Sequence, residues 1–404
     1  MTQDNGFSRR TALKLGASLG ATLGVTFLAS PVLAASAEGQ RKLVVIICRG
    51  AMDGLSVSPP IGDSNYYALR GPIAIPADQA LKLDSDFALH PKLPAIYALT
   101  QAGQARIAPA VAIPERIRSH FEAQDLLESG GDHLYGTTTG WLNRALSVQA
   151  RGATVTALAV GAQEPLILRG PSPIQSWSPG GKVTQDMTRI STVLQDLYAG
   201  DPMLSRAFAS GMQTEAMAES FNGDSAMNAP AQLQRLAHDY AVTTAKFLTQ
   251  PGGPSIAVLS LDGYDTHAGQ GAVNGQLANH LKTLDDVVNG LHDGLGETWS
   301  NTAIIAVTEF GRTAHINGTG GTDHGTASTM ILAGGALRRG GIVGDWPTLA
   351  DAKLFENRDL APTLDVRQVF KGVLRDHMGL EDRALDTTVF PKSGAAPALD
   401  GLIA

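Results

Sequence analysis

The chain alternates between short apolar runs and longer segments with helical spacing. Residues 42–48 form an apolar run, in which every residue from Leu43 to Cys48 is apolar. Such a run is typical of a strand buried on both faces of a sheet. Similar runs occur at residues 105–111, 155–160, 255–261, 303–308 and 329–333. We expect each of these runs to be a strand of one sheet.

Helical patterns separate the apolar runs. They cover residues 92–102, 120–129, 186–199 and 276–295, and a longer helical block covers residues 202–248. Strands that alternate with helices predict an α/β fold, doubly wound, with a mostly parallel sheet and helices on both faces. Because no linker or repeat divides the chain, we expect residues 35–404 to form a single domain with a helical insertion around 202–248.

The first 34 residues have the features of a twin-arginine signal peptide. Ser8-Arg9-Arg10 precedes a weakly hydrophobic run at residues 15–33. Cleavage is expected after Ala34, or as late as Ala37. Glycines and a Ser-Pro pair interrupt the run, which favours export with cleavage over a stable membrane anchor. We therefore expect a periplasmic or extracytoplasmic protein that has the twin-arginine translocation machinery as a partner.

The net charge, the cysteine content and the lack of nucleotide-binding motifs each exclude a class of partner, bond or cofactor. The formal net charge is −7, and removal of the signal makes the chain more negative. Nucleic acid and anionic lipid are therefore not expected partners. Cys48 is the single cysteine, so no internal disulfide can form, and we expect it to be a core residue. The chain has no phosphate-loop or dinucleotide fingerprint, so no nucleotide cofactor is indicated.

Acidic residues and histidines follow the predicted strands. An open α/β sheet places its chemistry beyond the carboxyl ends of its strands. Carboxylates and imidazoles that meet at such an edge are suitable ligands for a divalent cation such as zinc, manganese or calcium. The candidate metal ligands are Asp53, Asp265, His267, Glu309, Asp323 and His324.

A hydroxyl at a helix start is the main catalytic candidate. Ser119 and Glu122 have the spacing of a capping box, which predicts that the Ser119 hydroxyl lies at a helix N-terminus. There it is either a nucleophile or an anchor for a phosphoryl or sulfuryl oxygen, or it only caps the helix. His120 joins the candidate catalytic set. Arg312 and Arg118 could neutralise charge that develops on such a group.

Several motifs together resemble a known family. They are the segments RGAMDGLS at 49–56, RSHFEAQ at 118–124, GWLNR at 140–144, YDTH at 264–267, TEFGRT at 308–313 and GTDHG at 321–325. The chain resembles the twin-arginine-exported domain of unknown function 1501, a family grouped with the alkaline phosphatase and sulfatase superfamily. The resemblance extends from about residue 42 to residue 380 and implies an alkaline phosphatase-like fold. The family has no established activity.

The superfamily pattern also implies roles for individual residues. Ser119 looks like the nucleophile position, and His324 looks like the last metal ligand. Arg49 stands where an aspartate ligand is usual, and Phe310 where an imidazole is usual. A phenyl ring cannot ligate a cation, and a guanidinium brings a fixed positive charge.

The resemblance therefore implies at most one metal ion. The ion would be held by Asp265, His267, Glu309 and His324, with Asp323 as a ligand or as an orienting partner. Arg49 would then hold an anion, and we include it in the candidate catalytic set.

Two functions follow from these residues. The first is an exported metal-dependent hydrolase of phosphate or sulfate esters, which would act on a small anionic ester. The alternative is a catalytically inactive alkaline phosphatase-like protein that binds an anionic or carbohydrate ligand in the cell envelope. The clustered acids and histidines favour the hydrolase, whereas Phe310 and Arg49 favour the alternative.

Overall fold

The computed structural model describes residues 41–149, 156–161, 163–178 and 231–404. These residues contain an eight-stranded sheet with the order β10-β4-β9-β8-β1-β7-β5-β6. The strands are β1 (Lys42–Cys48), β4 (Ala105–Ala112), β5 (Ala157–Val160), β6 (Gln175–Trp177), β7 (Ile256–Leu261), β8 (Thr302–Val307), β9 (Ser328–Ala333) and β10 (Leu364–Asp365). A separate hairpin pairs β2 (Leu81–Lys82) with β3 (Ala88–Leu89).

The α-helices of the described residues lie between these strands or, for the last two, after β10. They are α2 (Gly54–Val57), α3 (Tyr66–Arg70), α4 (Pro94–Gln101), α5 (His120–Ser129), α6 (Trp141–Val148), α9 (Ala231–Thr249), α10 (Gln276–Leu295), α11 (Val366–Asp376) and α12 (Asp382–Ala384). All six predicted strands are confirmed, and so are the helices predicted at 92–102, 120–129 and 276–295. The helix predicted at 186–199, and the helical block up to residue 230, lie outside the described residues.

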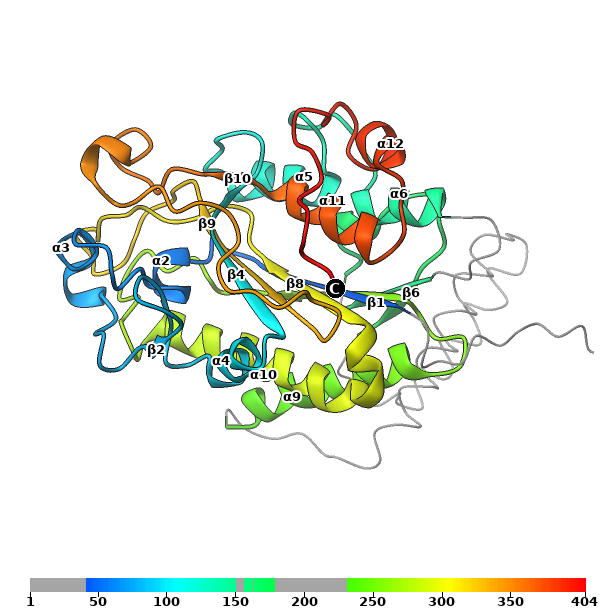
Figure 1. Ribbon diagram of the computed structural model, residues 1–404, viewed down its shortest axis with the longest axis horizontal. Coiled ribbons are helices and arrows are strands. Elements are labelled where there is room, and N and C mark those ends of the chain that lie inside the picture. Colours follow the sequence, from blue (N-terminus) through cyan, green and yellow to red (C-terminus); the bar gives the residue numbers. More distant parts are fainter. Residues whose placement is uncertain (1–40, 150–155, 162, 179–230) are drawn as a thin grey trace, which may run out of the picture. The chain divides into compact units, whose positions relative to one another are not determined.

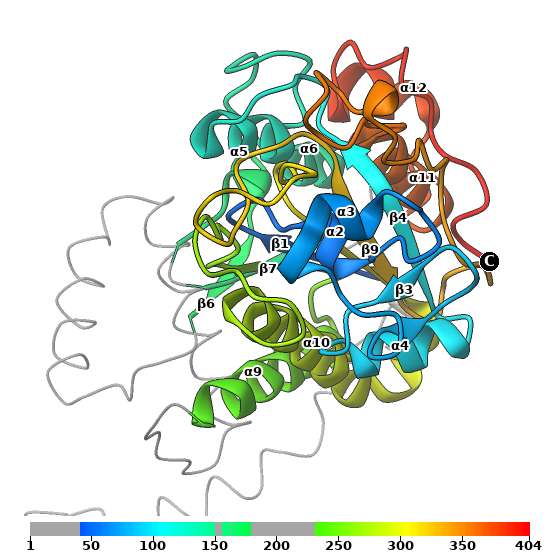
Figure 2. The same ribbon diagram turned by 90° about the vertical axis from the view of Figure 1, so that its left-hand side faces the viewer.

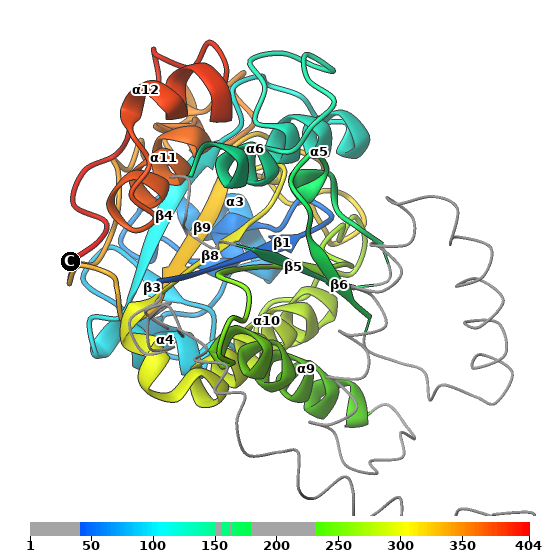
Figure 3. The ribbon, with the colours of Figure 1, turned by 90° about the vertical axis from the view of Figure 1, so that its right-hand side faces the viewer.

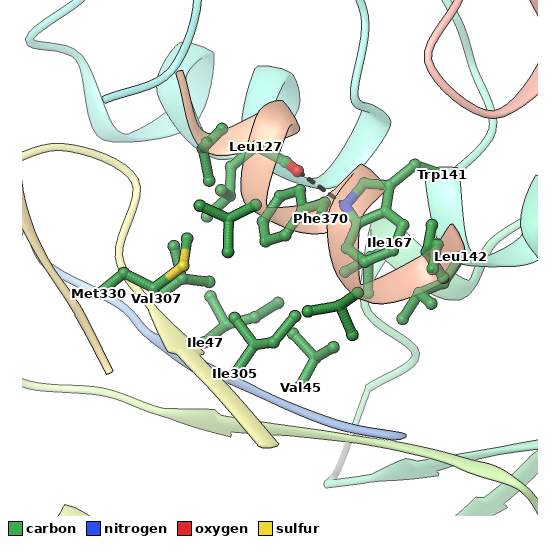
Figure 4. Close-up of a cluster of buried hydrophobic side chains, with 14 of the residues drawn as sticks. Val45, Ile47, Leu127, Trp141, Leu142, Ile167, Ile305, Val307, Met330 and Phe370 are labelled. Carbon is green, nitrogen blue, oxygen red and sulfur yellow. Dashed lines mark hydrogen bonds between the residues drawn. The ribbon is translucent and has the colours of Figure 1, made fainter. Parts of the chain in front are cut away.

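The position of strand β1 in the sheet accounts for its continuous apolar sequence. Its residues from Leu43 to Cys48 are completely buried, because β1 lies between β8 and β7 and both of its faces are covered. Val45 and Ile47 point into one hydrophobic cluster, which Figure 4 shows. Val44 and Cys48 point into the other cluster. Burial raises the pKa of the Cys48 thiol to about 12, so Cys48 is an inert core residue as expected.

Helices cover both faces of the sheet (Figures 1 and 3). Helices α5, α6 and α11 pack on one face, where Trp141 stacks on Phe370 with ring centroids 4.6 Å apart. Helices α4, α9 and α10 pack on the other face. The predicted doubly wound α/β fold is therefore confirmed. Among the described residues, no helix is both long enough and apolar enough to cross a membrane.

One reversed strand determines where the loops meet. Neighbouring strands are parallel except at β9, which is antiparallel to both β4 and β8. The carboxyl ends of β1, β4, β7 and β8 lie at one edge, and β9 begins at that edge. Residues just before Ser328 therefore lie close to residues that follow Val307. Figure 2 views the molecule with α2 and α3, which follow β1, in front of the sheet.

Candidate metal centre

Four side chains from three loops converge at this edge. His120 is the first residue of α5, Asp265 and His267 follow β7, and His324 precedes β9. The His324 Nε2 atom is 3.0 Å from the Nε2 atoms of both His120 and His267, and 3.2 Å from Oδ1 of Asp265. The second Asp265 oxygen is 3.4 Å from His120 Nε2. Possible ligand atoms of His120, Asp265 and His324 all lie within 4.8 Å of one another.

Hydrogen bonds determine which ring nitrogen of each histidine carries a proton. His324 Nδ1 is 2.7 Å from the backbone carbonyl oxygen of Arg118. A carbonyl oxygen can only accept, so His324 Nδ1 donates. His120 Nδ1 is 2.8 Å from Oε1 of Glu309, which is a carboxylate acceptor. In their neutral forms, both rings therefore present a lone pair at Nε2.

His267 follows the same rule. Its Nδ1 atom is 3.4 Å from Oδ1 of Asp323, and Asn317 Nδ2 donates to that oxygen at 3.0 Å. A carboxylate or carbonyl partner on the far nitrogen is the usual arrangement of a metal-binding histidine. Each of the three imidazoles has such a partner.

The spacing of His120, Asp265 and His324 is compatible with one cation. Tetrahedral zinc with bonds of about 2.0–2.1 Å separates its ligand atoms by roughly 3.3–3.4 Å. The His324 Nε2 atom is 3.0 Å from the Nε2 atoms of His120 and His267, a spacing at which neighbouring rings need either a metal ion or a shared proton between their nitrogens. The cluster is also open to solvent on one side, because the side chains of His267 and Asp265 are 45% and 41% exposed. These residues could hold one divalent ion.

Arg312 keeps Asp265 in its charged form. Its Nη1 atom donates to Asp265 Oδ1 at 2.6 Å, and its Nε donates to Thr322 Oγ1 at 3.1 Å. Partial burial alone would raise the Asp265 pKa, but the Arg312 bond outweighs it, and the net pKa lies below the usual range. Burial also lowers the pKa of His324, which favours the neutral ring that a metal requires.

Glu309 lies behind His120 and not among the converging atoms. Its side chain is completely buried, and Oε1 accepts hydrogen bonds from His120, from the Gly50 amide at 2.9 Å and from Gln124. Burial would raise the Glu309 pKa, but these hydrogen bonds outweigh it and lower the pKa. The structure therefore places Glu309 as an orienting partner of His120. Asp323 lies at the equivalent position behind His267, which is one of the two roles expected for it.

Asp53 is separate from the four converging side chains. It forms a completely buried ion pair with Arg70 and accepts hydrogen bonds from Gln270 Nε2 at 2.6 Å and from Ser56 Oγ at 2.8 Å. The guanidinium balances the buried carboxylate charge, as a buried acid requires. The structure thus gives Asp53 a partner other than the candidate metal position.

The three arginines that were expected to hold an anion already have acidic partners. Arg49 pairs with Glu128 at 2.6 Å and donates to Gln124 Oε1 at 2.7 Å. Arg118 pairs with Asp359 at 2.6 Å. Arg312, as described above, serves Asp265. In this structure the three guanidiniums stabilise the loops around the cluster.

Ser119 is at the expected position but does not cap the helix with its side chain. It precedes α5, which begins at His120, and its backbone oxygen accepts from Ala123 N at 2.9 Å. Its side chain makes no capping hydrogen bond, so the predicted capping box with Glu122 is wrong. Ser119 directly precedes His120, a member of the histidine cluster.

The sequence did not identify several residues that support the cluster. They are Arg70, Gln124, Gln270, Asn317 and Thr322. A signal existed for Gln124, since it follows His120 by four positions and therefore lies on the same face of α5. Arg70 and Gln270 contact Asp53 beside the cluster, whereas Asn317 and Thr322 contact Asp323 and Arg312 within the same loop.

Residues 40–389 match the model of a family described as "Protein of unknown function (DUF1501)". The chain belongs to this family. The family expected from the sequence motifs is therefore confirmed. No curated protein matches the chain.

Among solved structures, several are similar to the chain at low sequence identity. The phosphonate monoester hydrolase of Agrobacterium radiobacter has a TM-score of 0.39 and 12% identity, over 85% of this chain and 74% of that one. A sulfatase from Pseudoalteromonas sp. has a TM-score of 0.40 and 13% identity, over 91% and 74%. The C-terminal periplasmic domain of EcEptC from Escherichia coli, in complex with zinc, has a TM-score of 0.36 and 12% identity, over 88% and 87%.

Proposed function

We propose that this DUF1501 protein is a metal-dependent hydrolase of phosphate or sulfate esters. The observation that carries the proposal is that His120 and His324, whose Nδ1 atoms are held by acceptors, lie with Asp265 so that their possible ligand atoms are within 4.8 Å of one another. The His267 Nε2 atom lies 3.0 Å from that of His324. A divalent ion bound there would polarise an ester oxygen and lower the pKa of a nearby hydroxyl or water.

The chain's own residues would then bind and attack the ester. The first-turn amides of α5 have no carbonyl partner within the helix, so they favour a phosphoryl or sulfuryl oxygen. The Ser119 hydroxyl, at the same helix end, would attack or anchor that group. Arg312 would keep Asp265 ionised and oriented toward the cation.

We propose one ion and not two. Phe310 lies parallel to His120, with ring centroids 5.0 Å apart and an interplanar angle of 28°. Its ring is buried where the superfamily resemblance expects an imidazole, and it offers no ligand atom. Asp53, the acid nearest to the other missing ligand position, is paired with Arg70.

The proposal includes export. The twin-arginine segment lies outside the described residues, so this part depends on the sequence motif alone. We propose a periplasmic or extracytoplasmic protein that the twin-arginine machinery translocates and that acts on a small anionic ester.

The test is the metal content of the mature protein, purified without chelators from the periplasm. We expect about one equivalent of zinc, manganese, calcium or another divalent ion. His324→Ala should lose the ion, because this ring lies within 3.2 Å of the other three ligand candidates. His133→Ala is the matched control, since His133 is exposed and pairs with Asp132. A folded wild-type protein without metal would contradict the proposal.

The loaded protein would next be screened with phosphate and sulfate esters. We expect turnover that chelators abolish and that Ser119→Ala lowers without loss of the metal. A protein that binds metal but turns over no ester would favour the alternative, an inactive relative that binds an anionic or carbohydrate ligand.

A further inference from the structure

We infer that Arg49, Gln124 and Glu309 form a positioning chain, which holds His120 with its proton on Nδ1 and places a buried negative charge behind the metal centre. This inference depends on the proposed metal site. It assigns Glu309 a role other than that of ligand, and it assigns Gln124 a role that the sequence motifs did not indicate.

Glu309 is fully occupied by donors. Oε1 accepts from His120 Nδ1 at 2.8 Å, from the Gly50 amide at 2.9 Å and from Gln124 Nε2 at 3.1 Å. Oε2 accepts from the Thr308 hydroxyl at 2.9 Å. With four donors and no solvent exposure, the carboxylate is fixed in orientation. A fixed acceptor at Nδ1 leaves Nε2 of a neutral His120 as the metal-facing lone pair.

Gln124 has only one possible orientation in this chain. Arg49 Nη1 can only donate, so the Gln124 atom 2.7 Å away is the amide oxygen. The amide nitrogen must then face Glu309 and donate to it. Gln124 therefore links the guanidinium to the carboxylate and stops Glu309 from turning away from His120.

The other end of the chain is also fixed. Arg49 Nη2 pairs with Glu128 at 2.6 Å, and the Glu128 side chain is 3% exposed. Glu128 in turn accepts from the Ile167 amide at 3.1 Å. The arginine that was expected to hold an anionic substrate thus holds Gln124 in place.

Burial makes Glu309 the strongest of the three histidine partners. The Asp323 side chain behind His267 is 51% exposed, and His324 has a neutral backbone carbonyl as its partner. The Glu309 side chain is 0% exposed, so water does not screen its charge. Its effect on the centre should therefore exceed that of Asp323.

Three variants would separate the effect of the Glu309 charge from that of its hydrogen bond to His120. Glu309→Gln keeps a carbonyl acceptor for His120 but removes the charge. Glu309→Leu removes both the acceptor and the charge. Gln124→Met leaves Glu309 in place but removes the link between Arg49 and its carboxylate. The histidine tautomers would be assigned by ¹⁵N NMR on the metal-free protein, and metal dissociation constants would be measured by competition with a chromogenic zinc chelator.

We expect Glu309→Gln to keep His120 protonated at Nδ1 and to raise the zinc Kd about 10- to 100-fold, the usual cost of losing an orienting partner. Glu309→Leu should also move the His120 proton partly to Nε2. Gln124→Met should raise the Kd about tenfold, at the low end of that range. Asp323→Asn should have a smaller effect than Glu309→Gln.

Gln104→Met is the matched control for Gln124→Met. This substitution also removes a side-chain hydrogen bond, which Trp299 Nε1 donates to Gln104 at 3.1 Å. Gln104, however, directly precedes β4 and so lies at the opposite edge of the sheet. Unchanged zinc Kd values in both Gln124→Met and Glu309→Gln, or an unchanged His120 tautomer in Glu309→Leu, would overturn the inference. A wild-type protein that binds no metal would instead refute the proposed function, and the NMR result would still decide how His120 is held.

Discussion

At the residue scale, the hydrogen bonds of the buried His90 ring require that ring to be neutral. The residue is completely buried. Its Nε2 atom is 3.0 Å from the Ala272 carbonyl oxygen, and its Nδ1 accepts from the Lys92 amide at 3.1 Å. Only the neutral ring can donate at one nitrogen and accept at the other. Burial accordingly lowers the pKa of His90 from 6.5 to about 4.

This pKa predicts a loss of stability in acid. Between pH 6.5 and about 4 the unfolded chain binds a proton at His90 that the folded protein does not, so stability falls as the pH falls through this window. From pH 7 to pH 5 the loss should be roughly 2 kcal/mol. Urea denaturation at both pH values would measure it. His90→Asn keeps an acceptor for the Lys92 amide and should lose about 2 kcal/mol less. Equal losses in the two proteins would show that His90 is not the cause.

At the element scale, the turn after β1 brings three loops into contact. Gly50 has a φ of +110°, and a Cβ added there would be 2.6 Å from the backbone nitrogen of Asp265. The Gly50 amide donates to Glu309, and the Arg49 carbonyl accepts from Tyr264 N at 3.2 Å. The turn therefore fixes the loops after β7 and β8 relative to β1.

Gly50→Ala should disturb both stability and the metal centre. We expect the free energy of unfolding to fall by about 1–3 kcal/mol from backbone strain alone. The added Cβ should also displace Asp265 and weaken metal binding. Gly296→Ala is the control, because Gly296 has a φ of +53° but open space around its Cβ. Calorimetry and metal titration of both variants would separate the effect of backbone strain from that of the collision with Asp265. Unchanged metal affinity in Gly50→Ala would count against the coupling between this turn and the proposed metal site.

The contact between α11 and α6 gives a second prediction at this scale. Phe370 is 1% exposed and stacks on Trp141. Phe370→Ala should lower the free energy of unfolding by about 3–5 kcal/mol, because it leaves a cavity in the core. Phe121→Ala makes the same chemical change at a side chain that is 87% exposed, and should cost less than about 0.5 kcal/mol. Similar losses in the two variants, measured in urea, would contradict this account of the core.

At the scale of the whole molecule, the proposed ion would join loops that follow three strands. His120 follows β4, Asp265 and His267 follow β7, and His324 lies between β8 and β9. An ion that binds only the folded protein stabilises it by mass action. The unfolding temperature therefore reports metal binding without any knowledge of the substrate.

Zinc added to the metal-free protein should raise the unfolding temperature. At a free concentration of 100 times Kd the gain is about 2.7 kcal/mol. A chelator should reverse it, and His324→Ala should show no zinc-dependent gain, whereas His133→Ala should respond like the wild type. A rise of equal size in His324→Ala would place the ion elsewhere.

Local physics allowed much of the fold to be predicted. The strand at 42–48 is buried on both faces, so nearly all of its residues are apolar. A continuous apolar run therefore predicts such a strand from the sequence alone. Helix α10 keeps the predicted bounds of Gln276–Leu295 because one of its faces packs against the sheet. The family motifs likewise indicated the loops that contain the candidate metal ligands.

The sequence by itself thus determined the strands, the main helices of the described residues, the family and the loops with the candidate metal ligands, since each depends on patterns among neighbouring residues. The tertiary structure alone decided which of those side chains meet. The reversed direction of β9 brings His324 to the carboxyl edge, where it joins His120. Arg70 takes Asp53 as its partner, and Glu309 turns to the far side of His120. These pairings depend on contacts between residues far apart in the sequence, and no local pattern encodes them.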